Sequence, residues 1–280
     1  MHGYENTRIM RTMDPITPNK IRWINLSLLV LAVILFTTWL VFTPAGLENK
    51  ARAAGYAVCH QIESHRIDFA GRYLPLCARC TGMFLGTLVS LALLQKRKHA
   101  AGNPSKVFQV ILVIFLSAFI VDGVNSTLSL FPVIPQLYAP DNLLRLITGF
   151  MMGMVIGNLV MVLWHQTWWK QMSALPALSD WKHFILMIVV NALVGLIVWL
   201  QPQFLYYPIA ILSTAAIFFL LGMVYCLIWI IIFKKENTFE HYGEGLRFLL
   251  AGLATAVIQI GLLDLLRLSL TGTWQGFLLK

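Results

Sequence analysis

Seven runs of apolar residues, each about as long as a bilayer is thick, divide this chain of 280 residues. A helix rises about 1.5 Å per residue, so about 20 apolar residues cross the roughly 30 Å of hydrocarbon in a membrane. Backbone groups in lipid must bond within their own segment, which makes such runs helical. The chain is therefore predicted to be all-α, a polytopic transmembrane bundle of about seven helices. The runs are Trp23–Thr43, Cys80–Gln95, Val107–Leu130, Leu143–Trp164, Phe184–Leu200, Pro208–Phe233 and Leu246–Leu270.

The composition supports a bilayer as the solvent of this chain. Hydrophobic residues make up 58% and charged residues 12%, whereas soluble domains average about 45–50% and about 25%. The net charge of +9 is explained by lysines and arginines that hold loops on the cytoplasmic side. Nucleic-acid binding is excluded, because no loop is long enough for a reading domain. The predicted location is an integral, multi-pass membrane position, with the lipid bilayer as the partner and the oligomeric state open.

The distribution of basic residues predicts the orientation. With the N-terminus inside, the inner segments carry thirteen lysines and arginines and the outer segments six. This bias favours a cytoplasmic N-terminus. Five of the six outer basic residues lie in one segment, so we expect those charges to have partners or a function.

Three regions follow from the run pattern. Residues 1–20 are polar and are predicted to form a flexible cytoplasmic tail. Residues 21–165 form an N-terminal helical unit, which includes the one long outer segment, Pro44–Leu76. Residues 166–280 form a C-terminal extension of three helices. Small residues four apart, Gly82 with Gly86 and Gly149 with Gly153 and Gly157, predict close helix packing in the N-terminal unit.

Cysteines and histidines gather at the end of the outer segment. Cys59 and His60 are followed, after sixteen residues, by Cys77 and Cys80. This spacing suits a metal site with four ligands, because a Cys-x-x-Cys pair binds from one turn and a distant pair closes the other side. Adjacent side chains seldom share one metal, so His65 is an alternative to His60. Zinc or another transition metal is the predicted cofactor.

Thiol chemistry is a second interpretation of the same residues. Cys77 and Cys80 are expected at the N-terminus of a helix, where the helix dipole and Arg79 favour a thiolate. They would then act as a membrane thiol–disulfide oxidoreductase, with Cys59 as the resolving partner. A single structural disulfide would leave one of these three cysteines unpaired. The fourth cysteine, Cys226, lies in the sixth run and is predicted to be a buried small hydrophobe.

Four ionisable residues lie within the runs, where charge is costly and indicates function by default. Asp122, Arg145, Asp264 and Arg267 are all expected near the outer surface. The last two are three apart and share one helix face. All four are candidate catalytic residues, and together with the cysteines they predict a polar pocket beneath the outer segment. Each Asp–Arg pair taken alone is more often structural.

The motifs in this part of the chain resemble a bacterial membrane-protein family known as a domain of unknown function. Its signature is Cys-His-Gln, Cys-x-Arg-Cys-Thr-Gly, Asp-Gly and Asn-x-x-Arg-x-x-Thr-Gly. The matching residues begin at Cys59, Cys77, Asp122 and Asn142. The resemblance covers about residues 56–157 and implies a bacterial inner-membrane protein in which the cysteines, Asp122 and Arg145 belong to one unit. It supplies no activity and leaves Asp264 and Arg267 outside.

Three classes of function follow. The first is a metal protein whose site is either closed and structural or sensing, or open, so that a metal-activated water acts on a lipid or envelope substrate. The second is the thiol–disulfide oxidoreductase, passing electrons to a membrane quinone. The third is a transporter or channel, which we rank last because the polar residues stop near the outer half of the bundle.

Overall fold

The computed structural model describes residues 18–97, 99–130 and 135–276. The tail predicted for residues 1–20 lies outside this part apart from its last three residues, as do the basic residues Arg8, Arg11, Lys98 and Lys280. The described residues form helices α1 (Pro18–Phe42), α2 (Leu47–Val58), α3 (Ala78–Leu94), α4 (Lys106–Leu128), α5 (Asn142–Trp168), α6 (Trp181–Leu200), α7 (Tyr206–Ile232) and α8 (Leu246–Thr271). The short elements are the 3-10 helices η1 (Glu63–His65), η2 (Gln203–Leu205) and η3 (Tyr242–Gly245), and the strands β1 (Arg66–Asp68), β2 (Tyr73–Cys77), β3 (Ala100–Gly102) and β4 (Ser173–Pro176).

The predicted all-α bundle is confirmed, and each of the seven apolar runs forms a helix. Six of these helices, α1 and α4 to α8, are long and apolar enough to cross a bilayer. The seventh, α3, has only 17 residues and is the shorter apolar helix of the set. In α1 and α4 only 11% of the most apolar window is buried inside the protein. Their apolar side chains therefore face outward, as helices surrounded by lipid require.

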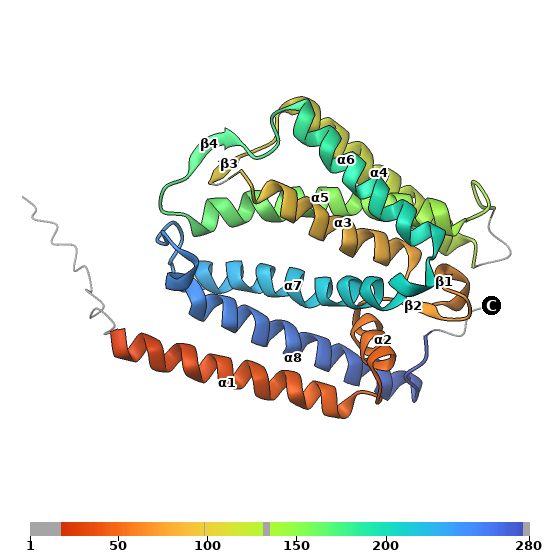
Figure 1. The fold of residues 1–280 in the computed structure, drawn as a ribbon, viewed down its shortest axis with the longest axis horizontal. Helices are drawn as coiled ribbons and strands as arrows, with labels where there is room; N and C mark the ends of the chain where they lie inside the picture. The colour runs from red at the N-terminus through yellow and green to blue at the C-terminus, as the bar shows by residue number, and fades with distance from the viewer. Residues whose placement is uncertain (1–17, 98, 131–134, 277–280) are drawn as a thin grey trace, which may run out of the picture.

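The helices stack in layers. In Figure 1 α1 lies against α8, α8 against α7, and α7 against the pair α3 and α5, with α4 and α6 on the far side of that pair. Helix α3 is thus enclosed by neighbours, which explains how a short helix with several polar residues is accommodated. Its first turn, which carries Cys80, lies against Gly149 of α5.

Glycines allow α3 and α5 to touch backbone to backbone. A Cβ atom added at Gly149 would lie 2.2 Å from the carbonyl oxygen of Arg79, and one at Gly82 would lie 2.4 Å from that of Leu146. A Cβ atom at Gly157 would lie 2.5 Å from the side chain of Ser90. The close packing predicted from the spacing of small residues is confirmed.

The outer segment Pro44–Leu76 has regular structure of its own. It contains α2, whose residues Ala51, Ala54 and Tyr56 are buried against the bundle, and most of the antiparallel hairpin β1–β2. We call the end of the bundle that carries this segment the cysteine end, seen near the labels α2, β1 and β2 in Figure 1. At the opposite end β3 and β4 pair in parallel.

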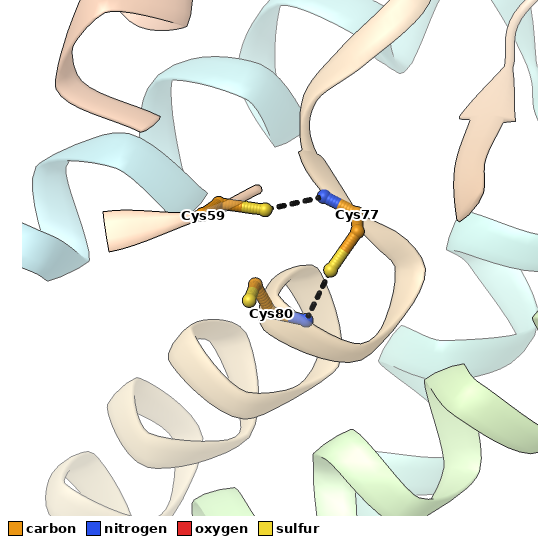
Figure 2. Close-up of side chains that lie close together, drawn as sticks. All are labelled: Cys59, Cys77 and Cys80. Carbon is orange, nitrogen blue, oxygen red and sulfur yellow. Dashed lines mark hydrogen bonds between the residues drawn. The ribbon is translucent and has the colours of Figure 1, made fainter. Parts of the chain in front are cut away.

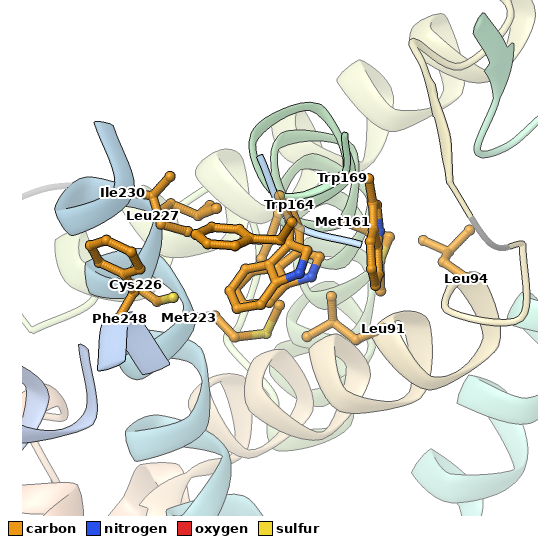
Figure 3. Packing of buried hydrophobic residues seen from close by; sticks show 13 residues of the cluster. Leu91, Leu94, Met161, Trp164, Trp169, Met223, Cys226, Leu227, Ile230 and Phe248 are labelled. Carbon is orange, nitrogen blue, oxygen red and sulfur yellow. The ribbon is translucent and has the colours of Figure 1, made fainter. Parts of the chain in front are cut away.

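The largest buried cluster lies toward that opposite end. It joins α3, α5, α7 and α8 and includes Trp164, Met161 and Met223 (Figure 3). The wholly buried Trp168 belongs to the same cluster. The rings of Trp164 and Trp168 stack with centroids 4.8 Å apart. Cys226 is part of this cluster and is fully buried, as predicted for a small hydrophobe.

Candidate metal centre

Three cysteines from two segments converge at the mouth of α3. Cys59 follows the last residue of α2, Cys77 ends β2, and Cys80 lies in the first turn of α3. Their sulfur atoms all lie within 4.8 Å of one another (Figure 2). The tight turn at the start of α3 brings Cys77 and Cys80 together, and the β1–β2 hairpin returns the chain to Cys59. All four cysteines of the chain are free thiols.

Backbone N–H groups point at two of these sulfur atoms. The amide of Cys77 donates to Sγ of Cys59 at 3.3 Å, and the amide of Cys80 donates to Sγ of Cys77 at 3.5 Å. Cys77 is thereby the N-cap of α3, where the positive end of the helix dipole favours negative charge. Hydrogen bonds from the Cys77 and Cys80 side chains hold the pKa of the Cys59 thiol well below its usual value. The surroundings therefore favour thiolate at Cys59.

The two candidate histidines lie beside this cluster. Nδ1 of His60 is 4.0 Å from Sγ of Cys59, and Nε2 of His60 is 2.9 Å from Nδ1 of His65. His60 thus contacts a sulfur atom directly, while His65 contacts His60. Burial, together with the nearby charge of Arg145, lowers the pKa of His65 to about 4, so this side chain is neutral near pH 7. Of the two histidines predicted as ligands, His60 is better placed.

Asp122 is bound by Arg79, the residue between the two cysteines of the Cys-x-Arg-Cys motif. Nε and Nη2 of Arg79 lie 3.0 and 2.6 Å from Oδ2 of Asp122. Tyr138 donates to Oδ1 at 2.9 Å and Thr148 donates to Oδ2 at 3.1 Å. Asp122 is completely buried. Arg79, which the sequence suggested as a direct promoter of thiolate formation, therefore has a carboxylate partner of its own.

Arg145 lies in the same region but has only neutral hydrogen-bond partners. Its Nε donates to Oγ of Ser126 and its Nη1 donates to Oδ1 of Asn142, both at 2.8 Å. Its exposed fraction is 5%, and among the described residues no carboxylate lies within 4.0 Å of it. Asn142 in turn donates to the carbonyl of Ser64 at 3.0 Å. Arg145 is therefore a buried cation that is joined to the segment containing the histidines.

The two candidate residues of α8 also reach the cysteine end. Nε1 of Trp39 in α1 donates to Asp264 at 2.9 Å. Arg267 donates to the carbonyl oxygens of Tyr56, Cys59 and His60. Both residues thus connect α8 to the start of the chain, although the sequence resemblance did not include them.

Three of the four basic residues in the segment Pro44–Leu76 have partners among the described residues, and only the carbonyl oxygen of the fourth, Arg52, accepts a hydrogen bond, from Gln61. Lys50 donates to the carbonyl oxygens of Leu40 and Thr43 at the end of α1. The guanidinium group of Arg72 donates to the hydroxyl of Tyr207 at 3.3 Å. That of Arg66 lies 4.9 Å from the ring centroid of Tyr73.

The sequence predicted a polar pocket around these charged residues, and the structure shows a different arrangement. Asp122 and Arg145 direct their polar atoms to neighbouring side chains. A cavity of about 500 Å³ lies between α1, α2, α7 and α8 and has an almost wholly apolar lining. The sequence could not show that Tyr138 bonds to Asp122 or that Ser126 bonds to Arg145, because neither Tyr138 nor Ser126 belongs to a motif. Thr148 does belong to one, the Asn-x-x-Arg-x-x-Thr-Gly stretch.

Comparison with known proteins finds similarity in the region that carries the cysteines. Residues 59–159 match the model of a family described as "Predicted membrane protein (DUF2085)". A curated relative from Methanothermobacter thermautotrophicus, described as an uncharacterized protein, is 29% identical over 111 residues, which make up 39% of this chain and 88% of the relative. No solved structure matches. The segment that carries the cysteines, Asp122 and Arg145 is therefore similar to a family of membrane proteins of unknown function.

Proposed function

We propose that Cys59, Cys77 and Cys80 bind a metal ion, zinc or another thiophilic transition metal, and that this metal organises the cysteine end of the bundle. The observation that carries the proposal is the convergence of three free sulfur atoms within 4.8 Å. Zn–S bonds of about 2.3 Å in a tetrahedral site set sulfur atoms roughly 3.8 Å apart. Small side-chain rotations from the observed positions reach that spacing.

His60 is the proposed fourth ligand. Its Nδ1 atom faces Cys59, and its Nε2 atom contacts His65. Metal-bound histidines usually have their second ring nitrogen fixed by a hydrogen bond, which sets the tautomer and the ring orientation. His65, which the sequence offered as an alternative ligand, would then support His60.

The charge of Arg145 supports a metal with three thiolates. A divalent ion with three thiolates and a neutral histidine carries one net negative charge. Arg145 is buried with neutral hydrogen-bond partners and lies within electrostatic range of Asp122, Cys77 and Asp141. Asp122 is already bound by Arg79. A buried cation is costly unless opposite charge offsets it, and the anionic centre would add to that offset. Three neutral thiols carry no charge and would not offset that of Arg145.

Burial favours a closed site over a hydrolytic one. Cys59 is 5% exposed and Cys77 is 1% exposed. A metal that activates water needs an open position that substrate can reach. We therefore assign the metal a structural or sensing role, in which it ties the end of α2 to the mouth of α3. An action on a lipid or envelope substrate would require this site to open.

Metal analysis of the detergent-purified protein tests the proposal. We expect about one zinc or similar ion per chain, and loss of that ion in the Cys77→Ser/Cys80→Ser variant. Cys226→Ser is the matched control, because Cys226 is a buried cysteine away from the cluster. A metal content far below one per chain, or one that the double variant retains, would overturn the proposal.

The second candidate function is thiol–disulfide exchange, favoured by the position of Cys77 and Cys80 at the N-terminus of α3. The two thiols would lose two electrons and two protons to form a disulfide, and a membrane quinone would take up both to become a quinol. Thiol trapping with and without reductant separates the two functions. A Cys77–Cys80 bond that responds to reductant supports the exchange reaction, whereas thiols protected by metal exclude it.

The orientation that we propose places the N-terminus in the cytoplasm and the cysteine end outside, in a bacterial inner membrane. Basic residues at the opposite end, among them Lys20, Arg97, Lys170 and Lys235, support this orientation. Reporter fusions before α1 and labelling of single exposed cysteines at each end test it. A label-accessible cysteine end on the cytoplasmic side would contradict it.

A further inference from the structure

Arg267 in α8 contacts the backbone on both sides of Cys59. Its Nη1 atom lies 2.6 Å from the carbonyl oxygen of Tyr56 and 2.5 Å from that of Cys59, and its Nη2 atom lies 3.1 Å from that of His60. The carbonyl groups in the last turn of a helix lack partners within the helix. The guanidinium group of Arg267 satisfies the one on Tyr56 and complements the negative end of the helix dipole.

The same guanidinium group lies on an aromatic ring. Its central carbon is 3.9 Å from the ring centroid of Tyr56. The hydroxyl of Tyr56 bonds to the hydroxyl of Thr271 and to the carbonyl oxygen of Thr273, both at 2.8 Å. The ring also packs against Trp274, with centroids 5.4 Å apart. The end of α2 is therefore held from α8 by hydrogen bonds, stacking and ring packing.

These contacts restrain the backbone from which the Cys59 side chain projects. Cys59 is the C-cap of α2 and is extended, with φ of −131° and ψ of 141°. Its carbonyl oxygen points to Arg267 while its sulfur atom accepts from the amide of Cys77. Fixing the carbonyl oxygen thus holds the Cys59 backbone in the position from which its sulfur atom reaches the amide of Cys77. A backbone free to rotate here would withdraw one of the three sulfur atoms.

We propose that Arg267 is a positioning residue for the cysteine site and that α8 is part of the metal-binding unit, although it lies outside the segment that resembles the family. This inference rests on the metal site proposed above. Arg267 touches no sulfur atom. It acts through the backbone of Cys59 and His60, so its loss weakens metal binding without removing a ligand.

The rate of zinc release to a chromophoric chelator measures this role. The Arg267→Met variant keeps much of the volume and loses every donor, and we expect it to release zinc at least about tenfold faster, the lower end of the range for groups that orient metal ligands. Arg267→Lys keeps the charge without the planar fork and should lie in between. Arg247→Met is the matched control, since Arg247 is at the opposite end of α8 and lies on the ring of Phe248.

Cobalt substitution separates positioning from general destabilisation. In Arg267→Lys we expect the thiolate-to-cobalt absorption to change in position or intensity by less than the share of one thiolate, because all three sulfur ligands remain, while the unfolding temperature stays at the wild-type value. Unchanged zinc release and unchanged cobalt absorption in both Arg267 variants would overturn the inference.

The positioning role of Arg267 can also be tested without a metal, through the reactivity of Cys59. If the wild-type protein binds no metal, the alkylation rate of Cys59 by N-ethylmaleimide tests Arg267 alone. Faster alkylation in Arg267→Met than in wild type and Arg247→Met supports the positioning role. Equal rates in all three proteins overturn it.

Discussion

Arg79 binds Asp122 through two of its nitrogen atoms, at 3.0 and 2.6 Å from the same carboxylate oxygen. Arg79 is two residues from Cys77, whereas Asp122 lies on α4, so the pair connects the mouth of α3 to a helix on the far side of α5. Tyr138 and Thr148 occupy the rest of the carboxylate. The segment from Cys77 to Cys80 therefore contributes both to the cysteine site and to the buried polar network around Asp122.

Removal of Asp122 should destabilise the protein strongly. The Asp122→Ala variant leaves Arg79, whose side chain is only 14% exposed, without its carboxylate, and breaking one partner of a buried pair costs about 3–5 kcal/mol. Thermal unfolding in detergent measures the loss. Glu240→Gln removes a partner of Lys170 in an ion pair that is more than half exposed on both sides, and it should leave the unfolding temperature unchanged. Equal effects of the two substitutions would contradict this interpretation of Asp122.

Gly149 should tolerate no side chain. The added methyl group of Gly149→Ala would lie 2.2 Å from the carbonyl oxygen of Arg79, which forces α3 and α5 apart at a cost of about 1–3 kcal/mol. At Gly261 the nearest atom to an added methyl group would be 3.9 Å away. Gly261→Ala should therefore be neutral or gain up to about 1 kcal/mol in helix propensity. Unfolding temperatures and cysteine alkylation rates of both variants provide the comparison.

Acidification should destabilise the metal-free protein through His65. In the unfolded chain this histidine takes up its proton near its ordinary pKa of 6.5, while in the folded chain its pKa is about 4. The unfolded state thus binds more protons between these values, so stability falls as the pH drops from about 6.5 to about 4. The unfolding midpoint of His65→Asn should vary less over this range than that of wild type. Parallel curves for the two proteins would refute the assignment.

Chelation should expose the cysteines in a defined order. Cys80 is partly exposed, whereas Cys59 and Cys77 are buried, so alkylation after metal removal should begin at Cys80. Cys226 has no exposed surface and should react only on unfolding. Mass spectrometry of peptides labelled with N-ethylmaleimide gives the order. Reaction of Cys226 before Cys80 would show that chelation unfolds the bundle.

The sequence predicted the helices well because their signal is local. Each apolar run is long enough to be identified from its own residues, and all seven became helices. The contact of α3 with α5 was also accessible, since the spacing of Gly149, Gly153 and Gly157 specifies a surface that admits another backbone. Helix α2 was missed because its mixture of alanine and charged residues is too polar for a span and too short to be obvious.

The partners of the charged residues could not be predicted in the same way. Asp122 and Arg79 are separated by 43 residues, and nothing in either motif indicates that one binds the other. Arg267 was noted only for its charge and its spacing from Asp264, whereas its hydrogen bonds described above are with backbone carbonyl groups, which every residue possesses. Such contacts depend on the relative positions of helices, which local patterns do not contain.

The contacts between Arg267 and the Cys59 backbone can form only late in the synthesis of this protein. Arg267 follows Cys59 by 208 residues, which a ribosome adds in roughly 10 to 40 seconds. For most of that interval, from Cys80 onward, the three thiols are already made but Arg267 is not. If Arg267 has the proposed role, a nascent chain passes through a stage in which Cys59 is not yet held in place, and that stage ends when α8 enters the bundle.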